Sequence, residues 1–149
     1  MLPRPIRVRR ARRDDLVPVL EILGAMGAPV PPPDRATLRR FRRLVADLGA
    51  DLYVATADEC VIGLVHMTYA RQVATSARAR IELLAAQPAA GIVAVSGRLL
   101  DWAVARARER GCCELAYEAG LSQPGVVELL SRSGWVRDGT MTRRLPLSH

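Results

Sequence analysis

The chain has 149 residues and half of them are hydrophobic, which is enough for one globular domain with a core and excludes a disordered protein. No apolar run approaches the ~20 residues of a membrane span, and the first residues lack the apolar stretch of a signal peptide. We therefore expect a cytoplasmic protein without a membrane partner. Three cysteines, two of them adjacent, and the absence of a metal-ligand spacing predict reduced thiols and no metal site.

The formal net charge of +7 raises the possibility of nucleic-acid binding. However, all 22 basic residues are arginine, and the chain contains neither lysine nor asparagine. That bias is typical of a GC-rich genome, so the charge alone is weak evidence for a nucleic-acid partner. We treat nucleic acid as an unlikely partner, although the charge still favours an anionic cofactor such as coenzyme A, or an acidic substrate.

The first half of the chain predicts a strand, two helices and a hairpin. Alternation of apolar residues with arginine predicts the strand, and acidic caps before apolar stripes predict the helices. In the second helix, Leu48 is expected to point inward with the other apolar residues, while arginines crowd the remaining surface. The predicted ranges are Ile6–Val8 for the strand, Leu16–Gly24 and Arg35–Leu48 for the helices, and Leu52–Thr56 with Val61–Arg71 for the hairpin.

A strand followed directly by a helix organises the second half of the chain. The apolar run Ile81–Ala86 predicts a buried strand that Pro88 ends. Small residues follow, and then a helical stripe stops at Gly111; the stripe contains Ile92, Ser96, Leu99, Leu100, Ala103 and Ala107. Such a junction presents backbone N–H groups and a positive helix end to an anion, although many junctions of this kind bind nothing and serve close packing.

The remaining residues predict a strand at Glu114–Glu118, a helix at Val126–Ser133, and a closing hairpin from Trp135–Val136 and Thr140–Leu147. The order is therefore β-α-α-β-β-β-α-β-α-β-β. This order predicts an α/β fold, with a mixed but mostly antiparallel central sheet and helices on both faces. We expect residues 1–149 to form a single domain.

The order and several short stretches resemble the GCN5-related N-acetyltransferase (GNAT) family. The resemblance covers about Ile6 to Leu147. It is carried by the opening strand and capped helix, the central hairpin with its Gly63, the positions of Pro88 and Leu99-Leu100, and the final helix running into Gly134-Trp135. It implies transfer of an acetyl group from acetyl-CoA to a primary amine of a small molecule or peptide, by direct attack in a ternary complex. Homodimers are common in the family.

The resemblance also implies a cofactor site. The family's loop, Arg/Gln-x-x-Gly-x-Gly/Ala, falls on Gly91, Ile92, Val93, Ala94, Val95 and Ser96, so its basic residue and middle glycine are missing here. Backbone amides of this loop are expected to bind the pyrophosphate. The amides of a bulged strand from Leu84 to Ala86 would polarise the thioester carbonyl. Gln123, in place of a family asparagine, would contact the cofactor through its amide. Because the glycines are replaced, weaker binding of coenzyme A is expected.

The candidate general base is Glu82, which lies upstream of the loop among apolar neighbours that could raise its pKa. It is equally interpretable as a carboxylate paired with Arg78 or Arg80, and His66 and Glu118 are alternative bases. Many family members protonate the departing thiolate with a tyrosine, but Leu130 stands at that position and cannot donate a proton. Tyr117 is a possible substitute acid, although a tyrosine on a strand is more often a packing residue.

Two functions follow from the resemblance. The first is an active N-acetyltransferase whose acceptor contacts the first two helices and the loop Gln72–Arg78. The alternative is a GNAT-like module that has lost efficient chemistry and acts as a coenzyme A-binding or protein-interaction domain. The altered loop and the missing tyrosine favour the alternative, whereas the continuous match along the chain favours the enzyme.

Overall fold

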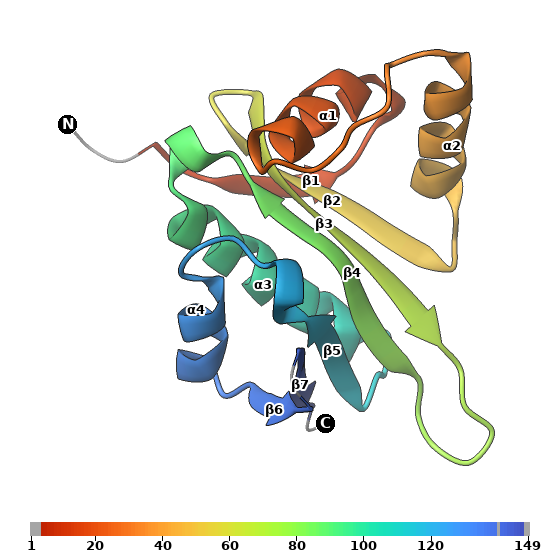
Figure 1. Ribbon diagram of the computed structural model, residues 1–149. Helices are drawn as coiled ribbons and strands as arrows, with labels where there is room; N and C mark the ends of the chain where they lie inside the picture. The colour runs from red at the N-terminus through yellow and green to blue at the C-terminus, as the bar shows by residue number, and fades with distance from the viewer. Residues whose placement is uncertain (1–3, 140, 148–149) are drawn as a thin grey trace.

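The computed structural model describes residues 4–139 and 141–147 of the chain. In this part, seven strands form one sheet in the order β1-β2-β3-β4-β5-β7-β6, with helices on either side of it (Figure 1). The strands are β1 (Arg7–Arg10), β2 (Ala50–Ala57), β3 (Cys60–Ala70), β4 (Arg78–Ala86), β5 (Glu114–Glu118), β6 (Val136–Asp138) and β7 (Thr142–Pro146). The helices are α1 (Leu16–Ala25), α2 (Arg35–Ala46), α3 (Ile92–Glu109) and α4 (Val126–Arg132).

The predicted order of elements is confirmed. Neighbouring strands are antiparallel throughout the sheet except β4 and β5, which are parallel and are joined by the crossover helix α3. Thr140, where the last strand was expected to begin, lies outside the described residues, as do Met1–Pro3. No helix in the described part of the chain combines the length and the apolar character that a bilayer span requires.

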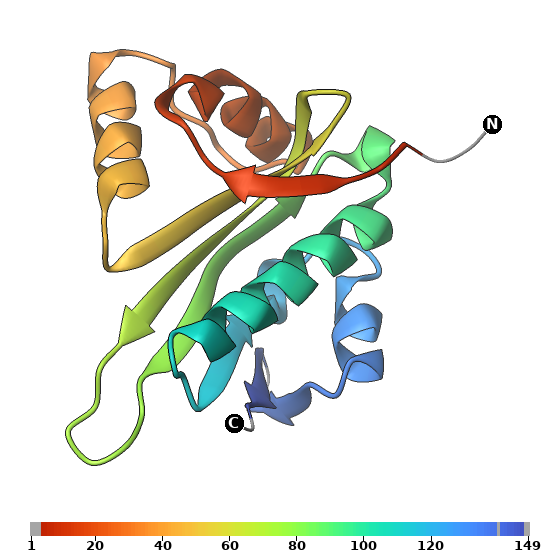
Figure 2. The same ribbon diagram turned by 180° about the vertical axis from the view of Figure 1, so that it is seen from behind.

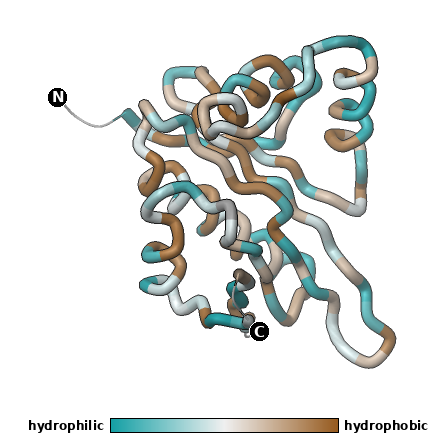
Figure 3. Tube along the Cα trace, in the orientation of Figure 1, coloured by the Kyte–Doolittle hydropathy of each residue, from teal (hydrophilic) through white to brown (hydrophobic). Residues whose placement is uncertain are grey.

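The helices cover both faces of the sheet, as predicted. Strand residues alternate between the faces: on β2, Tyr53 and Ala55 join the core under α3, whereas Leu52 and Val54 join the core under α1 and α2. Helix α3 packs against β2, β3 and β4, and it crosses the sheet diagonally in the view from behind (Figure 2). The hydropathy colouring shows brown, apolar stretches along the central strands between these layers (Figure 3).

Helix α3 approaches β3 so closely that only glycine fits at position 63. A Cβ atom on Gly63 would lie 2.5 Å from Val95 Cγ1 and 3.0 Å from the carbonyl oxygen of Ala85. Both Val95 and Leu99, the other neighbour of this site, are completely buried. Gly63 therefore sets the separation between the helix and the sheet, and with it the position of the amino end of α3 relative to β4.

One predicted detail of α2 is wrong. The helix ends at Ala46 because the next residue, Asp47, has an extended ψ of 118° and accepts a hydrogen bond from Gly49 N–H. Leu48 therefore lies beyond the helix and is 88% exposed rather than inward-facing. The remaining apolar residues of α2 pack toward the core under α1 and α2 as expected.

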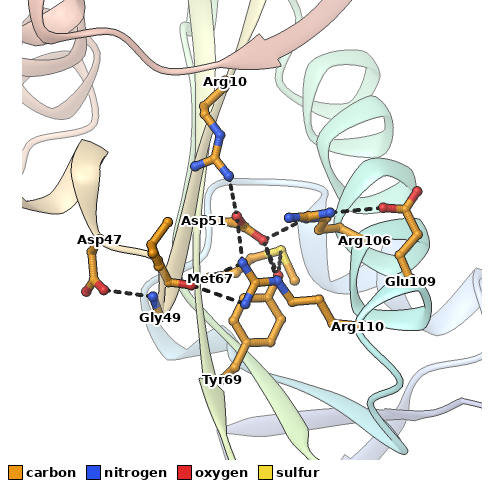
Figure 4. Close-up of polar contacts among 10 residues, drawn as sticks. Arg10, Asp47, Gly49, Asp51, Met67, Tyr69, Arg106, Glu109 and Arg110 are labelled. Carbon is orange, nitrogen blue, oxygen red and sulfur yellow. Dashed lines mark hydrogen bonds and ion pairs between the residues drawn. The ribbon is translucent and has the colours of Figure 1, made fainter.

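A cluster of charged residues joins the carboxyl end of α3 to three strands, and the sequence patterns did not single it out (Figure 4). Asp51 at the start of β2 is completely buried, and it accepts hydrogen bonds from Tyr69 Oη (2.5 Å), Arg10 (3.0 Å) and Arg106 (2.9 Å). Arg110 adds a contact at 3.4 Å, and its guanidinium lies over the Tyr69 ring. Burial alone would raise the pKa of Asp51, but hydrogen bonds from Tyr69 and Arg106 and the nearby positive charges lower it overall.

Candidate functional site

Strands β4 and β5 separate part-way along β4. Their parallel pairing extends only from Arg78 to Ile81 on β4, and the last pair joins Ile81 to Tyr117. At the next residue, Glu82, β4 also has a bulge relative to β3, because Met67 pairs with Ile81 while His66 pairs with Leu83. The bulge bends the strand where the two strands diverge, which leaves the rest of β4 without a β5 neighbour.

The departure of β5 exposes one edge of β4 to other partners. The N–H of Gln87 bonds to Ile62 on the β3 side, so the N–H groups of alternate residues, including Ala86 and Leu84, point toward the β5 side. Ala86 finds a partner there in Gln123, whereas Leu84, which pairs with Val65 of β3 on its other side, has no β5 partner among the described residues. Leu84 therefore presents a backbone donor and acceptor that an extended ligand can pair with.

The side chain of Gln123 acts as a short substitute for the missing strand. Its Oε1 accepts a hydrogen bond from Ala86 N–H at 2.8 Å, and its Nε2 donates to Ala86 carbonyl oxygen at 2.7 Å. Gln123 itself is buried. The sequence assigned both residues to the cofactor, but their polar groups are satisfied by each other. The single N–H of Ala86 is not available to a ligand unless this pair separates, whereas Gln123 Nε2 has a second N–H beside the one that it donates to Ala86.

Between β4 and α3 the chain makes a short turn over Pro88–Ala90 and then reaches Gly91, whose φ of +92° suits glycine. The first three helical N–H groups, those of Ile92, Val93 and Ala94, precede the first intrahelical bond, which runs from Val95 N–H to Gly91 oxygen at 3.1 Å. No side chain caps this end of α3. The helix therefore presents three backbone donors and the positive end of its dipole at the end of β4.

The predicted cofactor loop is thus largely helix, and this corrects its residue assignment. Only Gly91 lies before the helix. The N–H groups of Val95 and Ser96 lie within the helical hydrogen-bond pattern, so they are not donors to a ligand. The side chain of Val95 is buried in the core, and that of Val93 lies against Gly125, where a Cβ atom would be 2.7 Å from Val93 Cγ2. Ser96 Oγ is buried and has no partner in the described structure.

A row of polar side chains crosses the opposite face of the sheet, at the level of the bulge. Glu82 accepts a hydrogen bond from Thr68 Oγ1 at 2.8 Å, and Arg80 lies 3.5 Å from Glu82 and 3.0 Å from Glu118. Glu82 is exposed, so the expected apolar surroundings are wrong, and the alternative of an arginine-paired carboxylate is correct with Arg80 as the partner. Arg78 pairs with Glu114 instead.

His66 lies on the same face as Thr68, because its neighbours Val65 and Met67 point into the core under α3. Its Nε2 atom is buried and has no hydrogen-bond partner among the described residues. Burial lowers the pKa of His66, and the charges of Glu82 and Asp47 oppose this shift only in part. The imidazole is therefore neutral near pH 7. All three candidate bases, Glu82, His66 and Glu118, thus lie on one face beside the bulge.

Tyr117, the candidate acid, and Leu130, at the position of the family's tyrosine, both lie on the α3 side of the sheet. Tyr117 occupies the last paired position before the strands diverge, and its hydroxyl lies 3.3 Å from Ser122 Oγ. Burial raises the pKa of Tyr117, so the phenol stays protonated near neutral pH. Leu130 is completely buried and packs in the same core. Tyr117 thus pairs with the residue just before the bulge, whereas Leu130 offers no proton.

Solved structures match this arrangement of elements. A transcriptional regulator from Bacillus halodurans is 24% identical over 91% of this chain and 97% of its own, with a TM-score of 0.79. A putative GNAT acetyltransferase from Desulfovibrio desulfuricans is 17% identical over 95% and 99%, with a TM-score of 0.75. An N-acetyltransferase (PaiA) from Thermoplasma acidophilum, in complex with coenzyme A, is 14% identical over 96% and 99%, with a TM-score of 0.71.

The chain has the GNAT fold. No family model matches its sequence, and a search of curated proteins also found no match. The fold is therefore shared with these structures at sequence identities of 24%, 17% and 14%. Several positions of this chain differ from the pattern on which the sequence resemblance was based. Ala94 stands in place of the middle loop glycine, Leu130 in place of a tyrosine, and Gln123 in place of an asparagine.

The sequence patterns missed the position of the bulge, although a signal for it is present. Buried residues on the α3 side of β4 are Ala79 and Ile81 before Glu82, but Leu84 and Ala86 after it. The inward positions therefore change from odd to even across one residue. A regular strand keeps its parity, so this change indicates an inserted residue at Glu82.

Proposed function

We propose that this protein is an acetyl-CoA-dependent N-acetyltransferase that acts on a primary amine of a small molecule or peptide. One observation carries the proposal: β4 runs from a bulge at Glu82, without its β5 neighbour, directly toward the uncapped amino end of α3. This places hydrogen-bonding backbone and a helix dipole in one line with a carboxylate. Strand β4 thereby connects the amino end of α3, where an anion would bind, to Glu82, where an amine could lose a proton.

The described residues fit coenzyme A in two places. The N–H groups of Ile92, Val93 and Ala94 would hold the diphosphate, because an uncapped helix end favours a bound anion. The free backbone edge at Leu84 would pair with the amide groups of the extended arm. From Glu82 to Ala86 the strand covers about 13 Å, at roughly 3.3 Å per residue. A donor that binds at the helix end and reacts at the bulge must therefore have a long arm.

When bound, acetyl-CoA supplies a thioester carbonyl that an amine can attack. Glu82 would accept the proton of the attacking amine, with its carboxylate oriented by Thr68 and Arg80. Its exposure allows the acceptor to approach from the side of α1 and α2. Tyr117, at the point where the strands diverge, would return a proton to the departing thiolate. His66 and Glu118 are the alternative proton acceptors on the same face.

The cofactor site is tested by calorimetric titration with acetyl-CoA and with coenzyme A. We expect saturable binding of both, and no binding at millimolar ligand would contradict the proposal. The sharpest variant is Ile92→Pro, because proline fits the first helical position but removes its N–H. We expect affinity to fall about 10-fold or more for loss of a hydrogen bond to a charged group. The matched variant Ile92→Ala keeps the N–H and should retain affinity.

Catalysis is tested by release of free thiol from acetyl-CoA in the presence of a panel of amines, including amino acids, polyamines and peptides with a free amino terminus. We expect amine-dependent release with at least one class of acceptor. Mass spectrometry of that acceptor should show one added acetyl group. Thiol release that is independent of every amine would indicate hydrolysis and would contradict acetyl transfer.

Two observations favour a second function, a coenzyme A-binding module without efficient catalysis. Leu130 is buried at the position where many GNAT members have a proton-donating tyrosine, and the backbone N–H of Ala86 is already bonded to Gln123. This alternative predicts tight binding of acetyl-CoA with no thiol release for any amine. The titration and the thiol assay together therefore separate the two functions.

A further inference from the structure

Four of the five arginines of helix α2 form one exposed stripe, and Arg40 lies outside it. Arg35, Arg39, Arg42 and Arg43 occupy positions i, i+4, i+7 and i+8, so they lie on one side of the helix, opposite the buried Phe41. All four are exposed, and three of them line a shallow groove of about 370 Å³ together with Leu38. The helix stands at a corner of the molecule, joined to the start of β2, where a partner can reach it (Figure 1).

These arginines have no acidic partners within the described structure. Among the described residues outside α2, eight arginines form ion pairs, for example Arg9 with Asp15, Arg80 with Glu118 and Arg106 with Asp51, whereas others form none. No residue between Asp34 and Asp47 is acidic, and no ion pair of the described residues includes an arginine of α2. A chain-wide preference for arginine explains the residue type, but it does not explain why no acidic residue stands among these arginines between Asp34 and Asp47.

The stripe is unfavourable for the helix that carries it. Like charges at i,i+4, as in the pairs Arg35–Arg39 and Arg39–Arg43, each destabilise a helix by about 0.2–0.5 kcal/mol. Arg35 also lies in the first turn, where the helix dipole disfavours a positive charge. An arrangement that opposes helix formation is better explained by attraction to an external anion than by folding.

The composition of the stripe identifies the kind of anion. Protein partners usually require apolar or aromatic anchors at the centre of the interface. Here the exposed residues of α2 other than arginine are Ala36 and Ala46, Leu38 adds a half-buried side chain to the groove, and the single aromatic residue of α2, Phe41, is buried. Successive arginines four residues apart are spaced by about 6 Å along the axis. A regular row of charges without apolar anchors suits a partner that binds electrostatically through repeated phosphates.

We propose that the arginine stripe of α2 binds the phosphodiester backbone of a nucleic acid without reading its sequence. The proposal does not depend on acetyl transfer, because the stripe shares no residue with the β4 bulge or the amino end of α3. It differs from the expectation drawn from composition. Net charge alone was weak evidence, whereas four exposed guanidiniums on one face of α2 concentrate that charge in one place.

The test is fluorescence anisotropy with a labelled 20-base-pair DNA duplex and a labelled 20-nucleotide RNA, at salt concentrations between 50 and 200 mM. We expect a slope of log affinity against log salt of about −3 to −4, as four phosphate contacts predict, and an affinity loss of roughly 100-fold across this range. Tighter binding of the duplex or of the RNA identifies which nucleic acid carries the partner phosphates.

The decisive variant replaces all four arginines: Arg35→Gln, Arg39→Gln, Arg42→Gln and Arg43→Gln. It should lose most of the binding and of the salt slope, while its melting temperature stays equal or rises because the repulsion is removed. The matched control has the same change of charge at exposed positions on other elements: Arg7→Gln, Arg108→Gln, Arg132→Gln and Arg137→Gln. It should retain binding with a similar slope.

Three results would overturn the proposal. They are absence of nucleic-acid binding at 50 mM salt, an equal loss in the control variant, and equally tight α2-dependent binding of polyglutamate. The last result would assign the stripe to an acidic protein instead. Acetyl-CoA titration of the same variants separates this proposal from the enzymatic one, because the α2 variant should bind acetyl-CoA as the unaltered protein does.

Discussion

The molecule contains two polar clusters of similar composition and opposite character. Around Asp51, every polar group of the carboxylate is bonded, and the residues come from β1, β2, β3 and α3 (Figure 4). Around the bulge of β4, His66 Nε2 lacks a described partner and Glu82 is exposed to solvent. Both clusters lie on the central strands, but they lie at different places along them and on opposite faces.

The difference separates a structural cluster from a candidate site. A buried carboxylate is stable only when its partners are complete, so the Asp51 cluster leaves no group for a ligand. The bulge region has the reverse property, since its donors and acceptors are incomplete without a further molecule. Burial and charge alone therefore do not identify the site; the presence of unsatisfied groups does.

The largest effect on stability is expected for Asp51→Asn. The variant loses the negative charge and one of the two acceptor oxygens, and it sets an NH2 donor against three guanidiniums and Tyr69, which should lower the free energy of unfolding by about 3–5 kcal/mol. Urea denaturation measures the change. Glu109→Gln is the matched control, because Glu109 pairs with Arg106 at the exposed end of the cluster and should cost less than about 1 kcal/mol. Equal costs for both variants would remove the distinction between the clusters.

The largest effect on activity is expected for Glu82→Gln. Loss of the proton acceptor should lower kcat by about 10²–10³-fold, with little change in stability because Glu82 is exposed. Steady-state thiol release, with urea denaturation in parallel, measures both quantities. Glu118→Gln is the comparison, because it removes one negative charge from the same face of the sheet. A large loss in Glu118→Gln or His66→Gln, with normal activity in Glu82→Gln, would reassign the base.

An intermediate effect is expected for Gln123→Met, which keeps the length of the side chain but removes its amide. The N–H and carbonyl of Ala86 then lose their partner, and the free energy of unfolding should fall by about 1–3 kcal/mol. The affinity for acetyl-CoA is measured in the same variant. Reduced affinity supports a positioning role for Gln123, whereas tighter binding indicates that Gln123 competes with the ligand for β4. Gln87→Met is a control on the neighbouring, less buried residue.

The smallest effect concerns the pH dependence of stability through His66. Its pKa in the folded protein is lowered from 6.5, so as the pH falls the unfolded chain binds the proton first. The contribution of His66 to stability is therefore fully present above pH 6.5 and is lost as the pH falls through the lower folded pKa. Between pH 7 and pH 5, the unfolding free energy of His66→Gln should fall less than that of the unaltered protein. If the unfolding free energies of the two proteins fell equally between pH 7 and pH 5, His66 Nε2 would not be buried in solution.

Much of the architecture could be predicted from local patterns. Alternation of apolar residues placed β2 and β3, acidic caps placed α1 and α2, and the stripe from Ile92 to Ala107 placed α3. The order of these elements was sufficient to predict the mixed sheet with helices on both faces. Errors in the architecture lie at the ends and irregularities of elements: an extended residue at Asp47 ends α2 before Leu48, α3 begins at Ile92, and the bulge of β4 lies at Glu82.

The residue types of the candidate site were also visible in the sequence, because chemistry depends on side-chain identity. Glu82, His66, Glu118 and Tyr117 were all identified before the fold was known. Their relations were not visible, since hydrogen bonds between distant residues leave no local pattern. The pairing of Gln123 with Ala86 joins residues 37 positions apart, and Asp51 meets Arg106 across 55 positions.

The sequence by itself thus determined the order of elements, the class of fold and the list of candidate residues, because these follow from periodicity, caps and side-chain chemistry. The tertiary structure alone decided which backbone groups remain free. It placed the bulge at Glu82, left Leu84 without a partner on the β5 side, and bonded Gln123 to Ala86. Such outcomes depend on where strands separate and which groups meet, and that information exists only once the chain is folded.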